Sequence, residues 1–302
     1  MKAAAVDIGT NSMRLLIAET TPDGMREVAR QTVVTRLGQG VDSTGLLDPD
    51  AMARTLAVLA EYGSELYSHE VATVRAVATS ASRDASNTDE FFEAVEEVLG
   101  FRPEVISGDE EARLAFAGAT SLSSERPCLV IDIGGGSTEF VFGWDRPTYT
   151  RSIDIGSVRL MERELPHRPA HGEQVLNARR HVEHLLEELI LPEPPRVAIG
   201  VAGTFTSLAA INLDLEVYDS SRVHGSTLTY SDLLSLVDFL SGMTVAETEA
   251  IPSLDPARAP VILGGAVVAL TALLELDLDA VMVSEEDVLH GIARELLLGS
   301  SA

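Results

Sequence analysis

The sequence contains few residues of three kinds: cysteine, aromatic residues and basic residues. Its 302 residues include 1 cysteine and 1 tryptophan, and aromatic residues make up 5% of the chain. A single cysteine excludes an intramolecular disulfide framework, and a buried thiol in a reducing cytosol is the expected setting for Cys128. We therefore expect a cytoplasmic protein.

The scarcity of basic residues limits the partners that the surface can attract. Lys and Arg number 22 against 47 Asp and Glu, which gives a formal net charge of −25. Such a charge repels nucleic acids and anionic membrane surfaces, so we expect no DNA, RNA or membrane partner. A polyanion can still bind in a cleft where backbone N–H groups, a few arginines and a metal ion outweigh the net charge.

Long hydrophobic runs are also absent. The uncharged run Ala259 to Leu274 is shorter than the roughly 18 residues that a membrane-spanning helix needs. It contains the pair Gly264-Gly265, and we expect a buried helix there. The N-terminal segment MKAAAVDIGT lacks the longer apolar region of a signal peptide.

The apolar segments alternate between strand and helix patterns. This alternation, with 302 residues and 45% hydrophobic composition, predicts an α/β chain of two similar halves. Pro127 precedes the second strong pair of strand patterns, and we expect a boundary just before it. The expected domains are residues 1–124 and 125–302, with the last helix, 287–298, either in the second domain or packed back on the first.

Two segments repeat one pattern at an offset of 125 residues: VDIGTNSMRLLIA from Val6 and IDIGGGSTEFVFG from Ile131. Each predicts a strand, a tight turn and a second strand. They are identical at Asp7/Asp132, Ile8/Ile133, Gly9/Gly134 and Ser12/Ser137. One such turn is typical of an ordinary β-hairpin, but its duplication favours two halves of one phosphate-binding cleft.

The residue types in the two turns suit a phosphate chain with a magnesium ion. Glycine lets backbone N–H groups approach a phosphate, and the hydroxyls of Thr10, Ser12, Ser137 and Thr138 add donors. Mg²⁺ keeps several waters and uses one or two carboxylates, so the Asp beside each turn is suited to it, with Glu139 as a second carboxylate. A third glycine turn, residues 200–204, has the placement of another phosphate- or nucleotide-facing loop.

Seven segments of the chain, taken in order, resemble one family: DIGTNSMRL, TSASRDASN, ISGDEEARLAF, DIGGGSTEF, DIGSVRL, GVAGT and DPARAPVILGGA. They are similar to the exopolyphosphatase and guanosine pentaphosphate phosphohydrolase (Ppx/GppA) family, in the superfamily of actins, sugar kinases and heat-shock ATPases, and to its short two-domain type. The resemblance implies two ribonuclease H-like (actin-like ATPase) domains with an interdomain cleft. It also implies Mg²⁺-dependent hydrolysis of a terminal phosphoanhydride and a homodimer.

The resemblance assigns roles to particular residues. Glu111 is expected to be the general base for the attacking water. The expected metal ligands are Asp132, Glu139 and Asp7. The expected substrate-binding residues are Thr10, Asn11, Ser12, Arg14, Arg83, Gly134, Gly135, Gly136, Ser137, Gly203 and Thr204.

The residues alone leave several alternatives open. The pair Glu110-Glu111 is also typical of the solvated first turn of a helix, and lone arginines are typical of surface ion pairs. Inorganic polyphosphate is the first expected substrate, and the alternative is pppGpp, hydrolysed to ppGpp. A non-catalytic sensor of polyphosphate or nucleotide is a further alternative, against which Glu111, Asp132 and Glu139 argue.

Overall fold

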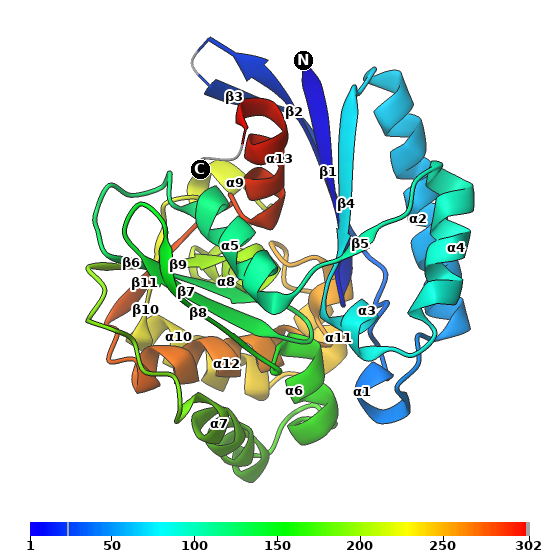
Figure 1. The fold of residues 1–302 in the computed structure, drawn as a ribbon. Coiled ribbons are helices and arrows are strands. Elements are labelled where there is room, and N and C mark those ends of the chain that lie inside the picture. Colours follow the sequence, from blue (N-terminus) through cyan, green and yellow to red (C-terminus); the bar gives the residue numbers. More distant parts are fainter. Residues whose placement is uncertain (23, 300–302) are drawn as a thin grey trace. The chain divides into compact units, whose positions relative to one another are not determined.

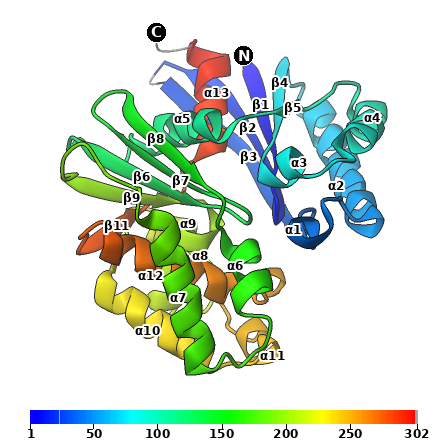
Figure 2. The ribbon, with the colours of Figure 1, turned by 60° about the horizontal axis from the view of Figure 1, so that its bottom comes forward.

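The computed structural model describes residues 1–22 and 24–299. The chain divides into two compact units, the first formed by Met1–Gly118 with the segment from Asp287 onward, and the second by Ala119–Glu286. Each unit is built on one sheet with parallel and antiparallel strands, covered by helices (Figures 1 and 2). The predicted α/β fold of two similar halves is therefore confirmed.

The first unit has a five-stranded sheet in the order β3-β2-β1-β4-β5. Its strands are β1 (Lys2–Ile8), β2 (Ser12–Thr21), β3 (Gly24–Val34), β4 (Thr73–Ala78) and β5 (Glu104–Val105). The first three are antiparallel neighbours, and β4 and β5 continue the sheet in parallel with β1. Its helices are α1 (Val41–Thr44), α2 (Pro49–Ser68), α3 (Ser80–Asp84), α4 (Thr88–Leu99), α5 (Gly108–Ala119) and α13 (Val288–Leu298).

The second unit has a six-stranded sheet in the order β10-β11-β9-β6-β7-β8. Its strands are β6 (Cys128–Ile133), β7 (Thr138–Gly143), β8 (Pro147–Ile153), β9 (Val197–Val201), β10 (Thr227–Thr229) and β11 (Ala280–Val283). Its helices are α6 (Ser157–Glu164), α7 (Gly172–Leu186), α8 (Ala202–Asn212), α9 (Ser220–Val223), α10 (Tyr230–Ser241), α11 (Val245–Glu249) and α12 (Ile262–Glu275), with a 3₁₀ turn at Pro256–Arg258.

The internal repeat of the sequence is a repeat of backbone geometry. Strands β1 and β2 pair antiparallel with Asp7 opposite Arg14, and β6 and β7 pair with Asp132 opposite Glu139. In both turns the N–H of the glycine donates to the carbonyl of the serine three residues later, over 3.1 Å in the first turn and 3.0 Å in the second. The predicted strand–turn–strand repeat is thus confirmed.

The helices follow the sequence signals that predict them. Asp48 caps α2, accepting hydrogen bonds from the backbone N–H groups of Asp50 and Ala51 at 3.0 Å each, as expected for Asp before Pro at a helix start. The uncharged run forms the buried helix α12, which lies in the core of the second unit. Among the described residues, no helix is long and apolar enough to cross a membrane.

The division between the units falls after Gly118 rather than after residue 124, which differs from the expected boundary. The last helix, α13, packs on β1 and β2 and belongs to the first unit, which is one of its two expected placements. The segment TSASRDASN contains the short helix α3. The five residues of α3 have no apolar period, so the sequence carries no helix signal there.

Candidate active site

Glu111 and Arg83 form an ion pair in the first unit. Glu111 lies in the first turn of α5, a helix whose start is stabilised by Ser107, which accepts a hydrogen bond from the N–H of Glu110 at 3.2 Å. Arg83, in the last turn of α3, donates from Nη1 to Oε2 of Glu111 at 3.0 Å and to the carbonyl of Ile106 at 2.8 Å. The structure therefore brings together two residues predicted for the site from different motifs.

The environment of Glu111 changes its acidity. The residue is only 9% exposed. Burial raises the pKa of Glu111 to about 7, and the nearby Asp7 adds to this effect, while Arg83 and Arg14 oppose it. A buried carboxyl group with a pKa near neutrality is suited to accept a proton, so Glu111 is a stronger base than a solvated glutamate. The alternative of a solvated helix turn is wrong for Glu111.

The turn between β1 and β2 is tied to the helix that carries Arg83. The hydroxyls of Thr10 and Ser80 are hydrogen-bonded at 2.8 Å, and the N–H of Ala81 donates to Thr10 Oγ1 at 3.2 Å. Asn11 Oδ1 and Ser82 Oγ are buried without a hydrogen-bond partner among the described residues. Buried polar atoms of this kind are usually satisfied by water or ligand, so this turn is a candidate binding surface.

Two further predicted site residues, Ser12 and Arg14, lie at the start of β2, just after this turn. Ser12 begins β2, and its carbonyl accepts the hydrogen bond from Gly9. Arg14 lies between two carboxylates: it pairs with Asp7, with Nε 2.8 Å from Oδ2, and it pairs with Asp287 through Nη1. Asp7 Oδ1 is buried and accepts no hydrogen bond from the described residues. Burial raises the pKa of Asp7 despite Arg14.

In the second unit, Asp132 and Glu139 lie on neighbouring strands at paired positions. Both carboxylates are buried, Asp132 at the end of β6 and Glu139 opposite it on β7. Ser152 on β8 donates to Glu139 Oε1 at 2.7 Å, which fixes the orientation of that carboxylate. The first copy of the repeat has an arginine where the second has Glu139, so the two copies differ in charge at this position.

The glycine turn of the second unit is bonded to the start of α6. The carbonyl of Gly134 accepts from Ser157 N at 2.9 Å, and that of Gly135 accepts from Val158 N at 2.9 Å. A Cβ on Gly156 would lie 2.6 Å from the carbonyl of Gly135, so only glycine fits there. Gly136 and Ser137 complete the turn, and both are buried. The segment DIGS, residues 154–157, and the start of α6 therefore hold the Gly134–Ser137 turn in place.

The third glycine segment is the start of a helix rather than a free turn. Gly203 and Thr204 lie in the first turn of α8, and Thr204 Oγ1 donates to the carbonyl of Ile133 at 2.9 Å. The residue with positive φ is Ala202, at 65°. A Cβ on Gly203 would lie 1.8 Å from Arg258 Nη1, so the Arg258 guanidinium lies directly over this glycine.

The possible metal ligands among the described residues form no group larger than a pair that could hold a metal ion. Within residues 1–22 and 24–299, no three His, Cys, Asp or Glu side chains are grouped closely enough to hold a metal ion. Two paired, buried carboxylates fit Mg²⁺, which takes one or two carboxylates and completes its shell with water and phosphate oxygens. Asp132 and Glu139 are such a pair.

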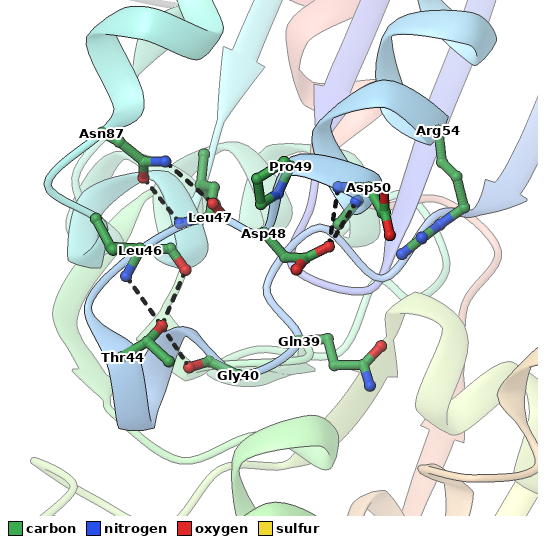
Figure 3. Close-up of a pocket in the computed structure, with 11 residues that line it drawn as sticks. Gln39, Gly40, Thr44, Leu46, Leu47, Asp48, Pro49, Asp50, Arg54 and Asn87 are labelled. Carbon is green, nitrogen blue, oxygen red and sulfur yellow. Dashed lines mark hydrogen bonds between the residues drawn. The ribbon is translucent and has the colours of Figure 1, made fainter.

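A separate pocket of about 550 Å³ lies at the start of α2 (Figure 3). Its lining includes Asp48, Asp50, Arg54 and Asn87, whose amide bonds both backbone groups of Leu47. None of the predicted site residues is among its lining residues. Its polar groups mainly serve the cap of α2 and the preceding loop, so the pocket is not the candidate active site.

Three residues near the predicted site were not identified from the sequence: Ser80, Arg258 and Asp287. Ser80 and Arg258 stand in segments that carry the family resemblance, TSASRDASN and DPARAPVILGGA. Asp287 precedes an apolar run with an N-cap pattern, which predicts a helix start but not a contact with Arg14.

The comparisons with known proteins agree with this geometry. Residues 16–299 match the Ppx/GppA phosphatase family. Exopolyphosphatase 2 of Mycobacterium tuberculosis is 42% identical over 98% of each chain. A crystal structure of an exopolyphosphatase-like protein has a TM-score of 0.95 at 37% identity, covering 100% of this chain and 99% of the other. An exopolyphosphatase from Cytophaga hutchinsonii has a TM-score of 0.92 at 28% identity, covering 99% and 98%. The chain therefore belongs to the Ppx/GppA phosphatase family.

Proposed function

We propose that this chain is an exopolyphosphatase, which hydrolyses the terminal phosphoanhydride bond of inorganic polyphosphate and releases orthophosphate. Its family and its exopolyphosphatase relatives support an enzyme of the phosphoanhydride hydrolase class. The observation that carries the mechanism is the buried pair of Glu111 and Arg83.

Glu111 activates the attacking water in this proposal. Arg83 bonds Oε2, and we assign the other carboxylate oxygen, Oε1, to the water. The water oxygen bonds to the terminal phosphorus as its proton passes to Glu111, and the bridging P–O bond breaks. The negative charge left on the bridging oxygen stays with the shortened chain. A pKa of about 7 keeps a large fraction of Glu111 deprotonated near neutral pH.

The substrate phosphates bind to backbone N–H groups and small polar side chains. In the first unit these are Thr10, Asn11 and Ser12, with Arg83 as the nearby cation. In the second unit they are the turn Gly134–Ser137 and the start of α8, with Arg258 beside Gly203. Phosphoryl transfer depends mainly on positioning and charge neutralisation, so these groups supply what the reaction requires.

Mg²⁺ is the cofactor of this proposal. Asp132 and Glu139 would hold it, and when bound it neutralises charge on the phosphate oxygens. Ser152 orients Glu139 for this role through its hydrogen bond of 2.7 Å. Asp7 as a further ligand stays a prediction from the sequence, and its buried Oδ1 has a lone pair that no described residue uses.

The experiment is orthophosphate release with Mg²⁺ from short-chain polyphosphate, long-chain polyphosphate and pppGpp. Glu111→Gln tests the base, and Glu110→Gln is the matched control, because it removes the neighbouring charge of the same helix turn. We expect polyphosphate to be the best substrate, activity to be lost in Glu111→Gln and with EDTA, and Glu110→Gln to stay active. Preference for pppGpp would make the enzyme a pppGpp phosphohydrolase. Binding of polyphosphate or pppGpp without release of orthophosphate would indicate a non-catalytic sensor.

A further inference from the structure

Arg14 is fixed from two sides by carboxylates of two different elements. Its Nε and Nη2 bond Asp7 on β1, and its Nη1 bonds Asp287 at the start of α13. The Arg14 side chain is 13% exposed and that of Asp287 1%. Bonds from both sides of a planar guanidinium determine its orientation as well as its position.

Helix α13, which carries Asp287, is fixed to α5, which carries Glu111. A Cβ on Gly118 of α5 would lie 2.0 Å from the carbonyl of Asp287, and a Cβ on Gly291 would lie 2.1 Å from the carbonyl of Leu114. Arg294 of α13 also donates to the carbonyl of Ala117 at 3.1 Å. Figures 1 and 2 show the two helices side by side. Two glycines at the contact allow the backbones to approach closely, so α13 holds Asp287 at a set place relative to α5.

Asp287 also caps α13, and this role does not require its negative charge. Asp287 caps α13, with Oδ1 accepting from the N–H of Leu289 at 3.0 Å, and a neutral asparagine caps a helix equally well. Burial alone would raise the pKa of Asp287, but Arg14 and His290 outweigh it and hold that pKa well below its usual range. A buried aspartate that stays ionised and pairs with Arg14 points to a role in placing that arginine.

The charges around Glu111 show why the place of Arg14 matters. Arg83 on α3 bonds Glu111, while Asp7 on β1 and Arg14 on β2 lie close enough to affect its acidity in opposite directions. Around Asp287, the basic groups are Arg14 on β2, Arg30 on β3 and His290 on α13 itself. The acidic groups near Asp287 are Asp7 on β1 and Glu27 on β3. Arg14 is the basic group that acts on both Glu111 and Asp287.

We propose that Asp287 is a positioning residue for the hydrolysis reaction: it holds the Arg14 guanidinium on Asp7 and so keeps Arg14 from pairing with the base Glu111. This inference rests on the proposed role of Glu111. Without the charge of Asp287, Arg14 loses the ion pair at Nη1 and can turn toward Glu111. A carboxylate bonded by two guanidinium groups is a weaker base, so water activation slows.

The test compares Asp287→Asn with Glu295→Gln on the same helix. Asn keeps the size and the cap of α13 but removes the charge. Glu295 pairs with Arg113 at 2.5 Å and with Arg75 at 3.2 Å, so its Gln variant loosens α13 without touching Arg14. The readouts are kcat and KM for polyphosphate, the pH profile of kcat, and the ¹⁵N NMR signal of Arg14 Nε. Arg14→Met alone and with Asp287→Asn completes a double-mutant cycle.

We expect Asp287→Asn to lower kcat about 10-fold with KM within about 3-fold, and to move the acid limb of the profile to lower pH. Glu295→Gln leaves the acid limb in place, and Asp287→Asn has no further effect in the Arg14→Met background. An unchanged acid limb and an unchanged Arg14 signal in Asp287→Asn would overturn the proposal, as would equal effects of the two α13 variants. If the wild type releases no orthophosphate, the proposed function fails, and the Arg14 signal still decides whether Asp287 holds Arg14.

Discussion

Arg83 on α3 and Glu111 on α5 form a hydrogen-bonded ion pair, with Nη1 3.0 Å from Oε2. The same Arg83 nitrogen donates to the carbonyl of Ile106, just before α5, at 2.8 Å. The guanidinium is thus fixed to the backbone as well as to the carboxylate. Such a pair orients the base without removing its basicity, because burial raises the pKa of Glu111 more than Arg83 lowers it.

The rate of orthophosphate release is expected to depend on pH through Glu111. The base must be deprotonated, so kcat should rise about tenfold per pH unit at low pH and level off above a pH of about 7. Steady-state kinetics between pH 5 and pH 9 check this, with circular dichroism to show that the fold persists. A profile that is flat between pH 5 and pH 7 would contradict it.

Arg83→Met is expected to move this profile. Arg83 lowers the pKa of Glu111 by its charge and its hydrogen bond, so its loss raises that pKa further. We expect the acid limb to shift upward by about 1 pH unit and kcat at pH 7 to fall roughly 5-fold. Arg83→Lys keeps the charge and should shift the limb less. Equal shifts in the two variants would count against the ion pair.

Glu111→Gln is expected to change stability in a pH-dependent way. The pKa of Glu111 is higher in the folded state than in the unfolded state. The favourable contribution of its carboxyl group to the free energy of unfolding is therefore fully present below about pH 4.5 and is lost as pH rises through about 7. The variant should therefore gain stability relative to the wild type between pH 5 and pH 8, by roughly 2 kcal/mol. Urea denaturation at the two pH values measures this difference. A constant difference would mean that the carboxyl group is not perturbed.

Asp132→Asn is expected to weaken Mg²⁺ binding. Removing one of two paired carboxylates should raise the Mg²⁺ concentration for half-maximal activity by about 10-fold or more. Ser152→Ala removes only the hydrogen bond to Glu139, so its effect should be smaller. Binding of Mn²⁺, followed by electron paramagnetic resonance, checks the site without turnover. Unchanged Mn²⁺ affinity in Asp132→Asn would place the metal elsewhere.

Gly118→Ala is expected to destabilise the protein, because the new Cβ would lie 2.0 Å from the carbonyl of Asp287. We expect a loss of about 2 kcal/mol or more, since the obstacle is backbone and cannot turn away. Gly172→Ala is the control, since nothing lies within 4 Å of its Cβ position. Thermal unfolding of both variants tests the close contact of α5 and α13. Similar melting temperatures for the two would contradict it.

Local sequence patterns predicted much of the fold. The repeated DIG segments predicted two strand–turn–strand units, because their apolar runs and glycine turns are contiguous in the chain. The uncharged run predicted the buried α12 for the same reason. Family resemblance singled out Glu111 and Arg83, which composition alone could not distinguish from surface ion pairs.

Contacts between distant parts of the chain could not be predicted. Arg14 and Asp287 are 273 residues apart, and nothing in either local pattern shows that they meet. Gly200 was expected to serve a turn, but a Cβ there would lie 2.5 Å from the ring of Phe205, so its role is close packing. Tertiary packing decides such contacts, and a single sequence contains no local signal of them.

Orthophosphate release from polyphosphate by the wild type and by Glu111→Gln, both with Mg²⁺ at pH 7, tests the central claim most directly. We predict that the wild type turns over and that the variant loses at least about 100-fold in kcat while it still binds polyphosphate. Turnover in Glu111→Gln close to that of the wild type would contradict the account, because the water would then be activated by another group.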